Sequence, residues 1–259
     1  MHEISPDGQT HVVPGLGGIV LDYKLGDSVD KFVSDHLQPG VTISSEKDFD
    51  EAQASDTNLA LFTYACLGNK VTIVDAEVPK LVGTEGTIIG KHGGVNYVMA
   101  QFEQDVLPKL PCNCEVKIEL YGCGLQDASY PDITFMNISP DVLVKMPIKA
   151  DDNGIMFPVV QHIPAKAMGS GLGSVDHSTD YDIMKPYGAN LKIGDFVAID
   201  EHYCKVGPTL QEGAVTIGVI VHGECIDPGH GPGVLPIATC KTTQLGTLIN
   251  SAANLQAYI

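Results

Sequence analysis

Arginine and tryptophan are both absent from this sequence. All 15 basic residues are lysines, and the chain has 32 acidic residues, which gives a formal net charge of −17. A nucleic-acid-binding protein needs a basic face to neutralise phosphates, and the guanidinium fork that reads guanine is missing here. The sequence therefore predicts a protein without a nucleic-acid partner.

Signals for export and for membrane insertion are also missing. No basic segment followed by an apolar run begins the sequence, and no apolar stretch reaches about 18 residues. The 7 cysteines are odd in number and scattered, without the CxxC pairs of a structural zinc site or the regular spacing of a disulfide framework. We therefore expect a cytoplasmic protein, in a reducing compartment and without a membrane partner.

Common catalytic and phosphate-binding motifs are lacking as well. No Gly-x-Ser-x-Gly elbow is present, so a serine nucleophile has no support. The glycine-rich loop 169–173 lacks the third glycine of a dinucleotide fingerprint and the Gly-Lys-Ser/Thr of a Walker loop. The loop could still present N–H groups to a carboxylate or phosphate, with a plain flexible loop as the alternative. Its candidate ligand-binding residues are Gly169, Ser170, Gly171 and Gly173.

The composition that remains favours a β-rich fold. Hydrophobic residues make up 44% of the chain and charged residues only 18%, so a core can form and disorder is not expected. The 28 glycines and 16 prolines suit many short strands and tight turns better than a helical bundle. We predict a β-rich α+β fold with few short helices. A polar stretch at 149–154 suggests two units, 1–150 and 151–259, and a long turn is the alternative.

Hydrophobic periodicity predicts several strands and two helices. Alternating or continuous β-rich segments occupy 18–23, 41–43, 71–74, 114–121, 133–135, 142–144, 157–160, 196–200 and 214–221. Segments 86–90 and 95–102 predict a hairpin around a turn at 91–94. The run 59–67 fits either a helix or a buried strand. Helical spacing predicts a helix from Ser28 to Leu37 and a short amphipathic helix over 245–255.

Two apolar runs end in His-Gly. One closes at His92-Gly93 and the other at His222-Gly223. Coincidence is one interpretation, and two similar half-barrels are the other. His92 also lies in a glycine-framed turn, which makes it a further candidate ligand-binding residue.

The loop from Asp227 to Gly233 is the main candidate for a working site. Three glycines and two prolines surround a single histidine, His230. Glycine allows backbone to approach a ligand closely and proline stiffens the path. The alternative is a tight turn that carries a solvated histidine.

A metal site is the chemistry that these residues suggest. His222 ends the most β-like segment, and Asp180 and Asp182 project to one side if their segment is extended. Two histidines with carboxylates suit Zn²⁺, Mn²⁺ or Fe²⁺. A structural histidine and a solvated acidic turn are the alternatives. The candidate metal ligands are His222, His230, Asp180, Asp182 and Asp227, with His222 and His230 also as catalytic residues.

Longer stretches resemble a known family. They include 162–165, 168–173, 180–183, 194–199, 213–218 and 222–234, with 92–95 and 137–140 in the first half. These stretches are similar to prokaryotic "domain of unknown function" proteins with an N-terminal RIFT-type β-barrel. The resemblance implies a RIFT-like barrel packed on a second β-rich part, and no activity. The Gly-Asp-x-Val strand at 194–197 also resembles, at the level of fold, the metal-dependent acetamidase/formamidase proteins.

Two functional hypotheses follow. The first is a metal-assisted hydrolase or lyase that acts on a small polar molecule. The second is a non-catalytic binding or self-assembling protein, because low charge and many strands suit homomeric packing. Under either hypothesis we expect a homo-oligomer.

Overall fold

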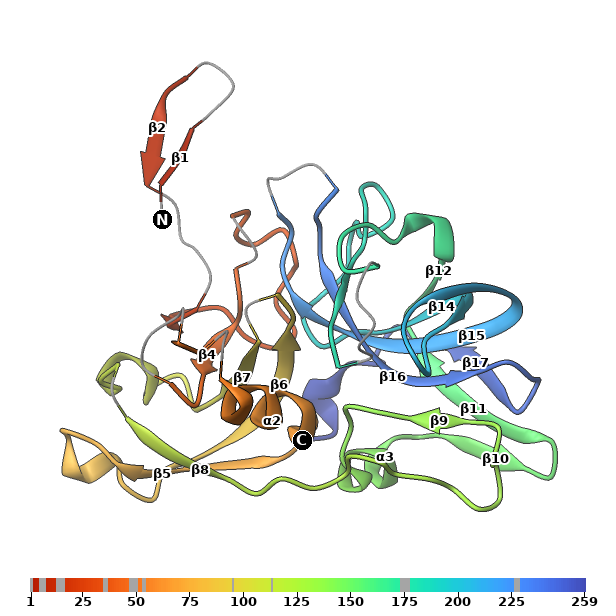
Figure 1. The fold of residues 1–259 in the computed structure, drawn as a ribbon, viewed down its shortest axis with the longest axis horizontal. Helices are drawn as coiled ribbons and strands as arrows, with labels where there is room; N and C mark the ends of the chain where they lie inside the picture. The colour runs from red at the N-terminus through yellow and green to blue at the C-terminus, as the bar shows by residue number, and fades with distance from the viewer. Residues whose placement is uncertain are drawn as a thin grey trace.

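The structure is a computed structural model of the 259-residue chain. It describes residues 2–4, 8–12, 17–34, 37–46, 51–52, 55–94, 96–112, 114–172, 178–225 and 229–259. Most of the regular structure is β-strand, accompanied by the short helices α2 (Asp56–Tyr64) and α3 (Pro140–Lys145) (Figure 1). The predicted β-rich class with few short helices is confirmed.

The first large sheet comes from the N-terminal half and is antiparallel. Its six strands lie in the order β3-β4-β7-β6-β5-β8. Their bounds are β3 (Ile19–Val20), β4 (Gly40–Ile43), β5 (Lys70–Asp75), β6 (Glu85–His92), β7 (Tyr97–Gln101) and β8 (Glu115–Ile118). The path is open, because β3 and β8 do not pair with each other among the described residues. The closed barrel implied by the family resemblance is therefore not found there.

The second large sheet is mixed. Its main path is β12-β14-β15-β16-β13, and β9 pairs with β16 off that path. The strands are β9 (Thr134–Phe135), β12 (Gln161–Pro164), β13 (Tyr181–Asp182), β14 (Phe196–Tyr203), β15 (Thr209–His222) and β16 (Gly233–Cys240). Within this sheet β12 and β14 are parallel neighbours, and the other described strand pairs are antiparallel. β15 and β16 also pack against β6, so the two large sheets meet at those strands (Figure 1).

Smaller sheets complete the fold. β10 (Lys149–Asp151), β11 (Gly154–Val159) and β17 (Leu245–Ile249) form one in that order. β1 (His2–Ile4) and β2 (Thr10–Val12) form a hairpin that stands away from the other sheets (Figure 1).

Two hydrophobic cores hold these layers. The smaller one lies between the first sheet and α2, and includes Phe62, Val71 and Ile88. The larger one gathers residues from both halves, from Tyr23 and Met99 to Leu255, around the second sheet. The junction of the two sheets is thus buried and closely packed, which suits a site that must hold side chains in fixed positions.

Lys91 shows how the sequence satisfies a buried charge near this junction. Its ammonium group donates to the carbonyl of Phe62 at 2.7 Å and lies 5.3 Å from the Phe62 ring centroid. Phe62 is in the last turn of α2, where carbonyl groups lack helical partners and the helix dipole favours a cation. Lys91 therefore caps α2, while the side chain of the next residue, His92, points to the opposite face of the strand.

Most predicted strands are present, whereas three segments were predicted wrongly. The segment 142–144 is part of α3, and 245–249 is strand β17 instead of helix. The helix predicted from Ser28 to Leu37 is absent from the described part, 28–34 and 37. The amide of Val29 donates to the carbonyl of Leu191, and its carbonyl accepts from Glu224, so tertiary pairing replaces helical hydrogen bonds. The ambiguous run 59–67 is largely helix α2.

Among the described residues, no helix is both long enough and apolar enough to cross a membrane.

Candidate metal centre

The centre is built around a glycine in strand β16. Gly233 pairs with His222 of β15 on one side and with Asp182 of β13 on the other. Residues that pair directly across antiparallel strands place their side chains on the same face. The side chains of His222 and Asp182 therefore lie on one face. Their backbones are two strand spacings, about 10 Å, apart, and Gly233 places no side chain between them.

That missing side chain leaves the space in which the polar groups meet. A Cβ atom on Gly233 would lie 2.1 Å from Nε2 of His222 and 2.5 Å from Oδ2 of Asp180. Both distances are far shorter than an ordinary contact, so any larger residue would displace the histidine or the carboxylate. Asp180 joins the same face because it lies two residues before Asp182, as predicted from the extended spacing.

The first sheet contributes His92, the last residue of β6. Its ring centroid lies 4.7 Å from that of His222, with an angle of 41° between the ring planes. The close approach of the strands below them explains this contact, since a Cβ on Gly90 would lie 2.9 Å from Cβ of Val221. The two His-Gly segments of the sequence thus end at the same point, one from each sheet.

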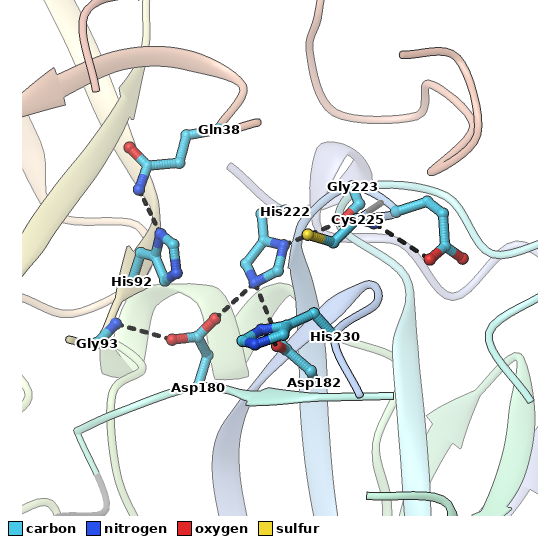
Figure 2. Close-up of polar contacts among 10 residues, drawn as sticks. Gln38, His92, Gly93, Asp180, Asp182, His222, Gly223, Cys225 and His230 are labelled. Carbon is cyan, nitrogen blue, oxygen red and sulfur yellow. Dashed lines mark hydrogen bonds and ion pairs between the residues drawn. The ribbon is translucent and has the colours of Figure 1, made fainter. Parts of the chain in front are cut away.

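Polar contacts converge on His222 (Figure 2). Its Nε2 atom lies 3.0 Å from Oδ2 of Asp180 and 3.2 Å from Oδ1 of Asp182. The other oxygen of Asp182 lies 2.8 Å from Nδ1 of His230. His92, Asp180, Asp182 and His222 are all buried, and His230 is partly exposed.

In His92, Asp180 and His222, one polar atom of each side chain faces away from the cluster. That atom contacts a backbone group or the side-chain amide of Gln38. Nδ1 of His222 lies 3.0 Å from the carbonyl oxygen of Gly223, to which it donates. Oδ1 of Asp180 accepts from the amide of Gly93 at 2.8 Å. Nδ1 of His92 lies 2.5 Å from the Gln38 amide. The other atom of each residue, Nε2 or Oδ2, is left on the inner side of the cluster.

The amide of Gln38 fits this arrangement in one of its two orientations. As drawn, Nε2 of Gln38 meets His92, and Oε1 has no hydrogen-bond partner among the described residues (Figure 2). A half-turn of the amide exchanges the two atoms, which have nearly the same shape. Oε1 then accepts from Nδ1–H of His92, and Nε2 of His92 keeps its lone pair for a ligand.

The carboxylates also dominate the electrostatics of the centre. Burial disfavours the charged form of His222, but its hydrogen bonds and charge interactions with Asp180 and Asp182 outweigh burial and raise its pKa to about 10. Burial alone would raise the pKa of the Asp180 carboxyl, yet His92 and His222 hold it below its ordinary value. At neutral pH a positive charge, here a proton on His222, is therefore bound between two carboxylates.

The donor set suits a divalent metal ion in place of that proton. One ligand atom each of His92, Asp180 and His222 can be chosen so that all three lie within 4.8 Å of one another. Ligand bonds of about 2.0–2.1 Å in a tetrahedral site place neighbouring donor atoms about 3.3 Å apart. The contacts of 3.0 and 3.2 Å from His222 to the carboxylates are close to that separation. These residues could hold a metal ion with little rearrangement.

The structure brings together four of the predicted metal ligands: Asp180, Asp182, His222 and His230. The fifth, Asp227, lies outside the described residues, as does Gly173 of the predicted anion loop. His92, predicted only as a ligand-binding residue, belongs to the metal cluster itself.

The rest of the glycine loop supports the site through its backbone. Gly169 donates to the carbonyl of Asp182, Ser170 donates to the carbonyl of Gly229, and Asp182 donates to the carbonyl of Ser170. A Cβ on Gly171 would lie 2.6 Å from the carbonyl of Asp180, so the loop packs tightly on the Asp180–Asp182 segment. Two N–H groups that an anion would need are thus already used. Anion binding by this loop remains a prediction, and it would have to use N–H groups other than those of Gly169 and Ser170.

Other polar clusters lie elsewhere. His202 is buried beside Thr216, and His162 lies on the surface between Asp200 and Thr247. A cavity of about 690 Å³ borders the first sheet, with Ile43 and Phe102 in its lining, and none of the residues of the metal cluster lines it. All seven cysteines are free thiols.

Comparison with known proteins places the chain in a family. Its residues 2–144 match "Domain of unknown function (DUF4438), N-terminal", and residues 145–259 match "Domain of unknown function (DUF4438), C-terminal". The chain belongs to this family. A solved structure described as "Crystal structure of TM1086" resembles this DUF4438 chain with a TM-score of 0.90 and 38% identity, and the match covers 100% of this chain and 90% of that one. No curated protein matches the chain.

The predicted resemblance to a family of unknown function is confirmed. Because the DUF4438 description names no activity, a functional conclusion must come from the geometry of the site.

Proposed function

We propose that this protein holds one divalent metal ion, Zn²⁺, Mn²⁺ or Fe²⁺, between His92, Asp180 and His222. One observation carries the proposal: three buried side chains turn one donor atom each toward a common point, while a backbone group or amide holds the other. Metal-binding histidines and carboxylates are normally oriented by such outer partners. A cluster that served only packing would not need this arrangement around a side-chain-free glycine.

We propose metal-assisted hydrolysis or lyase chemistry on a small polar substrate. A bound divalent ion supplies Lewis-acid polarisation of a carbonyl and a lowered pKa for a bound water. The resemblance of 194–197 to acetamidase/formamidase proteins is consistent with amide hydrolysis. The substrate must be small, since the ligands are buried and the neighbouring side chain of His230 is only 30% exposed.

Within this proposal, His222 acts as a ligand and His230 faces the substrate. Asp182 connects the two, because its carboxylate contacts both histidines. The proposed units 1–150 and 151–259 would each supply part of the centre, His92 from the first and the remaining residues from the second. Binding sites often form at such junctions.

Metal content tests this function directly. Protein purified without chelator should contain close to one equivalent of a transition metal, and His222→Gln and His92→Gln should lose it. His202→Gln is the matched control, because it also replaces a buried histidine but lies outside the cluster. Protein that carries no metal, and whose thermal midpoint does not respond to Zn²⁺, Mn²⁺ or Fe²⁺, would contradict the proposal.

Homo-oligomerisation is a second, separable proposal. The β1–β2 hairpin pairs with no other strand among the described residues, and an isolated two-stranded hairpin is marginally stable in water. Packing of the hairpin on a second copy would stabilise it, and would suit a self-assembling protein with or without catalysis. Light scattering of the full chain and of a chain without residues 1–12 tests this. Equal masses, both those of a monomer, would contradict it.

A further inference from the structure

We propose that Asp182 and His230 hold a second divalent cation next to the first, with the Asp182 carboxylate bridging the two ions. This inference rests on the proposed function, because it presupposes the ion held by His92, Asp180 and His222. It adds a binding position and makes the centre dinuclear.

The two oxygens of Asp182 point to different histidines. Oδ1 lies 3.2 Å from Nε2 of His222, and Oδ2 lies 2.8 Å from Nδ1 of His230 (Figure 2). A carboxylate whose oxygens each face a separate imidazole nitrogen has the geometry of a bridging ligand. Bridged ions in dinuclear hydrolytic sites lie about 3.5–4 Å apart, a span that one carboxylate can bridge.

The remaining carboxylate is oriented differently. Asp180 directs only Oδ2 toward His222, because its Oδ1 accepts from the amide of Gly93. Asp180 is therefore a ligand to one ion, whereas Asp182 contacts both histidines. The two residues differ in position, since Asp182 pairs with Gly233 in the sheet and Asp180 directly precedes the first residue of β13.

Burial predicts that the two positions differ in affinity. The side chains of His222 and Asp180 are 0% and 4% exposed, whereas that of His230 is 30% exposed. Only Asp182 and His230 are assigned to the second ion, so water or substrate oxygens would fill the rest of its coordination shell. The first ion should bind tightly, and the second should bind more weakly and exchange readily.

Mn²⁺ is a suitable probe, because two nearby Mn²⁺ ions give an exchange-coupled electron paramagnetic resonance spectrum. The full chain is stripped with chelator, and Mn²⁺ binding is then measured by equilibrium dialysis together with the spectrum. We expect two equivalents per chain in two affinity classes, with a coupled signal once the second class fills. His230→Ala should bind one equivalent and give an uncoupled signal.

The chain offers a matched control in His162. Its Nδ1 atom lies 2.8 Å from Oδ1 of Asp200, the same separation as in the His230–Asp182 pair, but on another part of the surface. His162→Ala should keep both equivalents and the coupled signal. Circular dichroism confirms that each variant is folded, and the spectrum of the wild-type chain tests coupling without any substitution.

The possible results separate the two proposals. One equivalent in the wild-type chain, lost in His222→Gln and unchanged in His230→Ala, would overturn the second ion and leave the proposed function standing. Two uncoupled equivalents, or two that persist in His230→Ala, would also overturn it. No bound Mn²⁺, Zn²⁺ or Fe²⁺ in any variant would overturn both proposals.

Discussion

Replacement of Gly233 by alanine should abolish metal binding, because this glycine creates the space at the centre. The added methyl group would lie 2.1 Å from Nε2 of His222, whereas ordinary contacts begin at 3.4 Å. A gap of about 1.3 Å must therefore open in a fully buried part of the sheet. Overpacking of this kind costs about 1–3 kcal/mol of unfolding free energy. For a chain of this size, that cost lowers the thermal midpoint by about 2–12 °C.

The response to metal separates loss of the site from loss of stability. At a free metal concentration of about 100 times Kd, the wild-type chain should gain about 2.7 kcal/mol. That gain raises its thermal midpoint by about 5–11 °C, and Gly233→Ala should gain nothing. Gly246→Ala is the control, because its methyl group would meet the end of the Met156 side chain, which is 37% exposed and can move away. A Gly233→Ala variant that binds and responds to metal like the wild type would refute the reasoning.

Three further predictions concern the Gln38–His92 contact, the pKa of His222 and the buried His202 outside the cluster. Gln38→Leu removes the partner of His92 and should weaken metal binding about 10- to 100-fold. A competition titration measures the affinity, and an unchanged value would show that Gln38 does not orient the ligand. The pKa of His222 is about 10 without metal, so metal binding at pH 7 should release close to one proton from this side chain. Calorimetry in buffers of different ionisation enthalpy detects the release. No proton release would contradict the placement of metal at Nε2 of His222. Burial lowers the pKa of His202 to about 4, below its ordinary 6.5, so protonation favours the unfolded chain and stability should fall by about 3 kcal/mol as pH drops through that range. His202→Gln should flatten this slope in urea titrations, and a slope equal to that of the wild type would show that other groups cause it.

The strands that the sequence predicted well are those with unambiguous local patterns. β15 is rich in β-branched residues, and β6 and β7 flank a glycine turn, so local preference and tertiary position agree. The segment 142–144 also has strand-forming residues, but Pro140 begins a helix there after Ser139. The strand propensity of 142–144 was overridden because a helix start signal, Ser139-Pro140, directly precedes this segment.

The helix predicted from Ser28 failed for a different reason. Val29 and its neighbours have helical spacing, yet the backbone of Val29 pairs with residues more than 160 positions away. No local pattern encodes such partners. The apolar positions do not share one buried face, since Val29 and Leu37 are in the core whereas Phe32 and Val33 are exposed.

The site was predictable in its second half and only hinted at in its first. Asp180, Asp182, His222 and His230 lie within 51 consecutive positions, and their residue types suggested a metal. His92 lies in the other sheet, so its place in the cluster depends on how β6 packs against β15. The repeated His-Gly ending was the signal in the sequence. It gained meaning only when the structure showed the two rings side by side.

The central claim is that His92, Asp180 and His222 bind a divalent ion. Its most direct test is X-ray absorption spectroscopy of the metal in the natively purified chain. We expect near-stoichiometric metal, with nitrogen and oxygen neighbours at about 2.0–2.2 Å and the outer-shell scattering of two or more imidazole rings. Metal below a tenth of an equivalent, or an ion surrounded by oxygen alone, would contradict the account.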